Sequence, residues 1–135
     1  MALFIFNKLV RDNLRAEYER LNQRAVYRKL SRVEHSNALK YKIIEEASEI
    51  TPELSHEELI GELADISQVI DDIMALHSIA PEDVATAQQR KFEKKGGFSG
   101  ATFIATLELD EDDEWTAYYR KSPDVFHEIK TDDKV

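Results

Sequence analysis

The sequence predicts a mainly helical protein that ends in a small β-hairpin or arm. Two capping-box patterns, at residues 31–34 and 55–58, each precede apolar residues at helical spacing. A further segment begins with Pro81, which suits the first position of a helix, and is followed by Gly96, which suits its C-terminal end. After this glycine, apolar and polar residues alternate, as is typical of strands.

Four helical segments follow one another in the first part of the chain. The weakest pattern runs from about residue 11 to 22, and residues 25–30 favour an extended conformation. The next two helices, from about 32 to 50 and from about 55 to 77, each carry an apolar stripe, and a short turn at Pro52 separates them. The stripes contain Leu39, Ile43 and Ile50 on the first helix, and Leu59, Leu63, Ile66, Ile70 and Ile73 on the second. The short turn favours antiparallel packing of this pair.

The C-terminal part has a different pattern. Alternating apolar residues at 103–109 and 115–119 flank an acidic turn, which predicts a hairpin or arm within residues 100–120. The polar tail, residues 130–135, predicts a frayed end. A chain of 135 residues has the usual size of one domain. We therefore expect a single domain over residues 1–135, with its helical core at about residues 7–98.

Composition excludes several classes of function. Eighteen basic and 27 acidic residues give a formal charge of -9, which opposes binding to nucleic acid. Carboxylates can nevertheless accept a small anionic substrate when divalent cations lie between them. The absence of cysteine favours the reducing cytoplasm, and the apolar run at residues 2–6 is too short for a membrane span. The composition thus predicts a cytoplasmic protein without nucleic-acid or membrane partners.

The clearest chemical pattern is a set of carboxylates on the two helices around Pro52. With about 100° per residue, Lys42, Glu45, Glu46 and Glu49 fall on one stripe of the first helix. Glu46 lies almost on the apolar face, where an unpaired carboxylate is costly. On the second helix, Glu62 and Asp65 border the apolar stripe, and Asp72 falls close to Asp65. Four or five oxygen ligands suit Mg²⁺ or Mn²⁺.

Each of these residue types also has an ordinary structural interpretation. Glutamates are common on solvated helices, so the carboxylates by themselves predict only a divalent-metal site. The four histidines are scattered along the chain, and we interpret them as surface or packing residues. Aromatic residues at such positions pack more often than they stack on a base; the candidates for stacking are Tyr27, Phe98, Trp115 and Tyr119.

The carboxylate spacing resembles that of a known family. Glu45-Glu46-x-x-Glu49, followed after twelve residues by Glu62-x-x-Asp65, is similar to the signature of the all-α nucleotide pyrophosphatases. That group includes MazG proteins, dimeric dUTPases and phosphoribosyl-ATP pyrophosphohydrolases. Two flanking segments, residues 7–12 (NKLVRD) and 91–98 (KFEKKGGF), resemble a MazG-like subgroup. The subgroup commonly continues with Lys-Ile-Pro, whereas this chain has Asn-Leu-Arg at residues 13–15.

The resemblance implies a fold, an activity and a site. The fold is an all-α nucleotide pyrophosphatase-like helical bundle, and the activity is hydrolysis of a nucleoside triphosphate to the monophosphate and pyrophosphate. The implied metal ligands, for Mg²⁺ or alternatively Mn²⁺, are Glu46, Glu49, Glu62 and Asp65, with Glu45 as the candidate general base. The residues available to bind the substrate phosphates are Lys8, Arg11, Lys42, Lys91 and Lys95, and weaker site candidates are Asp72 and Phe98. The family also implies a homo-oligomer, as a dimer or a tetramer.

Two other functions stay open at this point. The resemblance extends to phosphoribosyl-ATP pyrophosphohydrolases, so phosphoribosyl-ATP is an alternative substrate. The acidic segment at residues 110–115 lies outside every matched motif. A non-catalytic regulatory module that binds metal and nucleotide is therefore the alternative from another class.

Overall fold

A computed structural model describes residues 1–130, and this range contains five helices and no strand. The mainly helical prediction is confirmed. The chain divides into two compact units, Met1–Lys95 and Gly96–Val135. Within the described range, no helix is both long and apolar enough to cross a membrane. The predicted frayed tail lies, after Lys130, outside the described residues.

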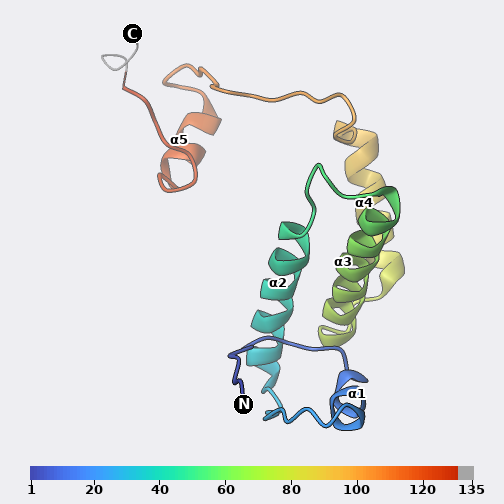
Figure 1. The fold of residues 1–135 in the computed structure, drawn as a ribbon. Helices are drawn as coiled ribbons and strands as arrows, with labels where there is room; N and C mark the ends of the chain where they lie inside the picture. The colour runs from blue at the N-terminus through green and yellow to red at the C-terminus, as the bar shows by residue number, and fades with distance from the viewer. Residues whose placement is uncertain (131–135) are drawn as a thin grey trace. The chain divides into compact units, whose positions relative to one another are not determined.

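The first unit is built on an antiparallel pair of helices, α2 (Arg32–Ser48) and α3 (His56–Leu76), which pack side by side (Figure 1). Both begin with the predicted capping boxes. At α3, the Ser55 hydroxyl accepts a hydrogen bond from the Glu58 backbone N–H at 3.1 Å, and the Glu58 carboxylate accepts one from the Ser55 N–H at 3.1 Å. These bonds satisfy backbone donors that a helix start leaves free.

The apolar core of this unit is small. Its buried apolar side chains are Leu39 on α2 and Val69 and Met74 on α3. The predicted stripe of α3 is therefore only partly correct, because Leu59, Leu63 and Ile70 are exposed while Ile66 and Ile73 are half-buried. Helix α3 is apolar over a wide part of its circumference, and periodicity alone does not define which part faces α2. The face of α3 that packs against α2 carries Glu62, Ile66, Val69 and Ile73.

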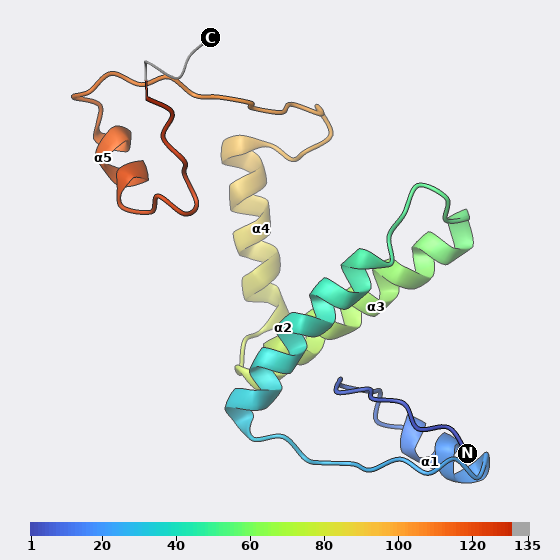
Figure 2. The ribbon, with the colours of Figure 1, turned by 60° about the vertical axis from the view of Figure 1, so that its left-hand side comes forward.

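The remaining helices of the first unit are less packed. Helix α1 (Leu14–Arg20) is shorter than predicted; its N-cap residue, Asn13, makes no side-chain capping bond. No strand forms at residues 25–30. Helix α4 (Pro81–Lys95) leaves the end of α3 (Figure 2), and all of its residues are exposed. Gly96 follows it with a φ of 77°, which confirms the predicted glycine at the helix end.

The second unit contains helix α5 (Glu114–Arg120) where a strand was predicted. The predicted hairpin is wrong, because no strand lies within residues 100–130. Asp113 caps α5 by accepting a hydrogen bond from the Trp115 N–H at 2.8 Å, and the Thr116 hydroxyl donates to the Asp110 carbonyl at 2.7 Å. The strand prediction used the alternation of residues 115, 117 and 119, but residues 115, 118 and 119 follow the period of a helix, and the Asp113 cap favours the helix.

Candidate metal centre

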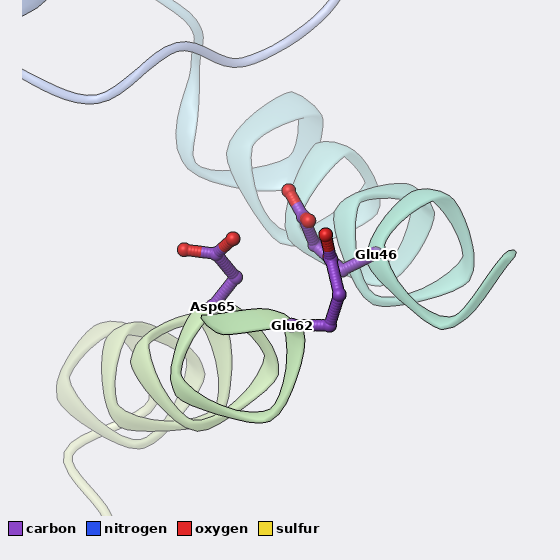
Figure 3. A group of neighbouring side chains, drawn as sticks. All are labelled: Glu46, Glu62 and Asp65. Carbon is purple, nitrogen blue, oxygen red and sulfur yellow. The ribbon is translucent and has the colours of Figure 1, made fainter. Parts of the chain in front are cut away.

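Three carboxylates from α2 and α3 form the centre of the candidate site. Glu46, Glu62 and Asp65 each offer an oxygen atom, and these atoms lie within 4.8 Å of one another. Figure 3 shows Glu46 on one helix and Glu62 and Asp65 on the other, with the carboxylates of Glu46 and Glu62 directed towards each other. The helix period explains the arrangement, because Glu62 and Asp65 are three residues apart and so share a face of α3.

Glu62 is the carboxylate in the least favourable surroundings. Its Oε2 atom is buried and has no hydrogen-bond partner among the described residues. Its pKa is raised above the usual range, first by burial, then by the negative charge of Glu46 and by a hydrogen bond that the protonated form shares with Glu46, and last by the charges of Asp65 and Glu49. An ionised carboxylate in these surroundings is unfavourable unless a proton or a cation compensates its charge. Three converging carboxylates are the donor set that a hard divalent cation such as Mg²⁺ prefers, so the residues fit the predicted metal.

Basic side chains surround the carboxylates on the side of the N-terminal segment. The Lys42 ammonium lies 2.8 Å from Glu45 Oε2 and 3.6 Å from Glu46 Oε1. Lys8 donates to Glu45 Oε1 at 2.9 Å, and the Arg11 guanidinium lies 2.5 Å from Asp65 Oδ1. Lys8 and Glu45 are 37 positions apart in the sequence, and Arg11 and Asp65 are 54 positions apart. These pairs hold the N-terminal segment against α2 and α3.

Glu45, the candidate general base, is held by two lysines. Hydrogen bonds from Lys42 and Lys8 keep the pKa of this carboxyl below its usual range, and their charges add to the effect. Glu45 is therefore ionised at neutral pH, in the form that accepts a proton. Its low pKa makes it a weak base, which suits proton removal only from a water that is already acidified.

A hollow of about 220 Å³ adjoins the carboxylates. Its lining contains the charged residues Lys8, Arg11, Lys42, Glu46 and Asp65, and also apolar and aromatic residues of the N-terminal part, within residues 6–18. A hollow lined by both basic and apolar side chains suits a ligand that carries both phosphates and an apolar ring.

Other predicted site residues do not belong to this group of carboxylates and basic side chains. Glu49 follows the end of α2 and is exposed; it acts on Glu62 only through its charge. Asp72 is exposed on α3 and does not belong to the group of three. Lys91 and Lys95 are exposed on α4, and no ion pair joins them to a carboxylate within residues 1–130. Phe98 belongs to the second unit and is fully exposed. The roles assigned to these residues stay predictions.

The aromatic lining of the hollow was not predicted from the sequence. Tyr18 and Phe6 line it, whereas Tyr27, the stacking candidate within the first unit, does not. A signal for Tyr18 exists, because it follows Arg11 by seven residues and Leu14 by four, and this spacing places the three side chains on one side of a helical segment. The signal has meaning only once Arg11 is known to lie beside the carboxylates.

Comparison with known proteins gives no match: no family model, curated protein or solved structure is significantly similar to the chain. The resemblance to the all-α nucleotide pyrophosphatases therefore stays a prediction that depends on the motif residues. The structure independently assembles three of the four predicted metal ligands and three of the five predicted phosphate-binding residues in one place.

Proposed function

We propose that the chain is a cytoplasmic, Mg²⁺-dependent nucleotide pyrophosphatase that converts nucleoside triphosphates to the monophosphate and pyrophosphate. One observation carries the proposal: a group of three carboxylates with an unpartnered, buried oxygen lies directly beside three basic side chains. Carboxylates suit a cation and basic groups suit phosphates, and phosphoryl transfer needs both within one site. The absence of cysteine supports the cytoplasmic setting.

Each group of the site has a defined part in the proposed reaction. Glu46, Glu62 and Asp65 would hold Mg²⁺, or Mn²⁺ in its place. When bound, the cation neutralises phosphate oxygens and acidifies a coordinated water. Lys8, Arg11 and Lys42 bind and orient the triphosphate in the hollow beside the carboxylates.

Glu45 has a different part, because it stays ionised at neutral pH and can accept the proton of the attacking water. Its two lysine partners also line the phosphate end of the hollow. A triphosphate that binds these lysines competes with Glu45 for them. Its arrival therefore weakens the interactions that depress the pKa of Glu45, and it makes this carboxylate a stronger base when substrate is present.

The test is release of pyrophosphate from a panel of standard and modified nucleoside triphosphates in the presence of Mg²⁺. We expect turnover by the wild-type chain and a loss of more than about 100-fold in Glu62→Gln, because a proposed metal ligand is removed. The matched control is Glu57→Gln, an exposed glutamate of the same helix, which keeps full activity. Equal activity in the two variants would contradict the proposed site.

The same panel decides between the alternative functions. Phosphoribosyl-ATP belongs in the panel, and turnover of that compound alone would assign the narrower activity. Binding of nucleotide without repeated release of pyrophosphate would assign a non-catalytic module. The acidic segment that prompted this last alternative has structural contacts, because Asp113 caps α5 and Glu111 pairs with Arg120 at 2.9 Å.

We also propose that the chain is a homo-oligomer. Helix α3 exposes an apolar stripe of Leu59, Ile60, Leu63 and Ile70, whose exposed fractions are 36%, 54%, 50% and 40%. A helix stripe of this kind is normally covered, and only three apolar side chains are buried in the described residues. A second copy of the chain presents the same stripe, so a symmetric contact covers both faces.

Light scattering coupled to size-exclusion chromatography tests this part of the proposal. We expect a mass of at least twice the 15.6 kDa of one chain. Leu63→Lys places a charge in the stripe and lowers the mass, while Gln68→Lys, at an exposed polar position of the same helix, does not. A monomeric wild-type protein would refute the proposed oligomer and leave the proposed activity untouched.

A further inference from the structure

The apolar and aromatic residues that line the hollow, which we call its apolar end, come from one short stretch of chain. Phe6, Leu9, Val10, Leu14 and Tyr18 line it, and all of them come from the N-terminal segment or α1. Lys8 lies between these residues and the carboxylates, because its Nζ atom is 5.5 Å from the centre of the Phe6 ring and 2.9 Å from Glu45 Oε1. The apolar residues are thus close to the charged groups of the site.

We propose that the apolar end is the nucleoside subsite of the proposed pyrophosphatase and that the Tyr18 ring stacks on the base. This inference rests on the proposed function. A hollow of about 220 Å³ is smaller than the roughly 300–1,000 Å³ of a site that encloses a whole drug-sized ligand. It holds one ring system, and the triphosphate extends from that ring to the basic side chains and the carboxylates.

Tyr18 is the lining aromatic best suited to stacking. It is half-buried on α1, whereas Phe6 lies in a segment without secondary structure and has 57% of its surface exposed. A half-buried ring on a helix already has a restricted orientation, so a base loses less entropy when it stacks there. Leu14, one turn before Tyr18, packs on the same side and helps to define the wall.

The composition of this wall also defines the substrate class. Among the five residues of the apolar end, Tyr18 is the only one whose side chain carries a group able to form hydrogen bonds, its hydroxyl. Selection among bases needs several such groups aimed at the edges of the base, while stacking tolerates every base because each has a flat face. The subsite therefore accepts nucleoside triphosphates with different bases.

Binding of a non-hydrolysable nucleotide, α,β-methylene-ATP, and of inorganic tripolyphosphate tests the subsite by calorimetry in the presence of Mg²⁺. Tyr18→Leu keeps an apolar residue but removes the ring, and we expect it to weaken nucleotide binding by about 5- to 150-fold. Binding of tripolyphosphate stays unchanged, because it has no base. Tyr18→Phe retains the ring and the nucleotide affinity. The control is Tyr41→Leu on α2, where the ring is 65% exposed and outside the hollow.

The outcomes separate the subsite from the catalytic proposal. A selective loss of nucleotide binding in Tyr18→Leu supports the subsite even if no pyrophosphate is released. Equal losses for nucleotide and tripolyphosphate, no loss at all, or the same loss in Tyr41→Leu overturn it, even where pyrophosphate release proves the activity. If the wild type binds neither ligand, both proposals fail. Circular dichroism of Tyr18→Leu and Tyr18→Phe shows that the variants are folded.

Discussion

Replacing Glu62 by glutamine separates two effects of this carboxylate on stability: the cost of its charge without a cation and the stabilisation gained through Mg²⁺ binding. Without a cation, the ionised side chain is unfavourable, because its Oε2 has no partner and Glu46 and Asp65 add negative charge beside it. Glutamine has the same shape, carries no charge and can donate a hydrogen bond to Glu46. We therefore expect Glu62→Gln to raise the melting temperature in EDTA and to lose most of the stabilisation by Mg²⁺.

The size of the Mg²⁺ effect follows from linkage. At a concentration 100 times the dissociation constant, a ligand of the folded state stabilises it by about 2.7 kcal/mol. For a chain of this size, each kcal/mol raises the melting temperature by roughly 4 °C, so we expect Mg²⁺ at that concentration to raise that of the wild type by roughly 10 °C. Glu62→Gln removes one of the three converging ligands, which we take to weaken Mg²⁺ binding about 100-fold. At the same Mg²⁺ concentration, the ion then stabilises the variant by only about 0.4 kcal/mol and raises its melting temperature by less than about 2 °C.

Differential scanning calorimetry in EDTA and in a series of Mg²⁺ concentrations measures both effects. Glu57→Gln, on the exposed part of the same helix, should show the wild-type response to Mg²⁺. The reasoning is wrong if Mg²⁺ stabilises Glu62→Gln as much as the wild type. It is also wrong if the substitution lowers the melting temperature in EDTA, since the carboxylate would then have a favourable partner.

Three further predictions concern pH, helix capping and the general base. In EDTA, the folded state binds more protons at Glu62 than the unfolded state above the ordinary pKa of 4.5, so stability falls as pH rises through the raised pKa. Calorimetry from pH 4 to 7 should show this fall in the wild type relative to Glu62→Gln. Ser55→Ala removes the hydroxyl of a capping box and should cost about 1 kcal/mol in chemical denaturation. Ser67→Ala, which only loses a bond within its own helix, should cost less. Lys42→Met removes the largest cause of the low pKa of Glu45, the hydrogen bond from Lys42. The pKa of Glu45 should therefore rise, as measured by an NMR titration of its carboxyl carbon. An unchanged pKa would show that Lys42 does not lower it.

The part of the fold that the sequence predicts well is governed by local signals. The capping boxes, Pro81 and Gly96 act within a few residues of themselves, and the helices they delimit form where expected. The C-terminal segment shows the opposite case. Its residues fit both a strand and a helix, and the outcome depends on the cap at Asp113 and on the contact of Thr116 with Asp110. No periodicity contains that information.

The site also combines features that local sequence spacing predicts with features that depend on long-range contacts. The spacing within each helix places Glu62 and Asp65 on one face, so their proximity follows from the sequence. The rotation of α3 about its own axis relative to α2 does not follow from the sequence. This rotation moves Glu62 from the predicted border of the apolar stripe to the face that packs against α2. The N-terminal wall of the hollow depends on ion pairs that span 37 and 54 residues. Local patterns predict which groups are available, whereas these long-range pairs determine where Tyr18 lies.

The balance of charge in the site leads to a last prediction, about the order in which ligands bind. Three basic side chains and four carboxylates contact one another there: Lys8, Arg11 and Lys42 with Glu45, Glu46, Glu62 and Asp65. With all of them ionised, the site carries one excess negative charge, and each basic group already has a carboxylate partner. A triphosphate that approaches this site without a cation is repelled by the excess negative charge. At separations below about 8 Å, physiological salt screens this repulsion poorly.

A single divalent cation held by Glu46, Glu62 and Asp65 would change the sign of that balance, and it would compete with Arg11 for Asp65 and with Lys42 for Glu46. The basic groups would then be available to phosphate oxygens. We expect calorimetry to detect binding of α,β-methylene-ATP only with Mg²⁺ present, and Asp65→Asn to weaken this requirement because it removes one negative charge and frees Arg11. Equal nucleotide affinity of the wild type in EDTA and in Mg²⁺ would show that the basic side chains are available without a cation, and that the carboxylates do not control access to them.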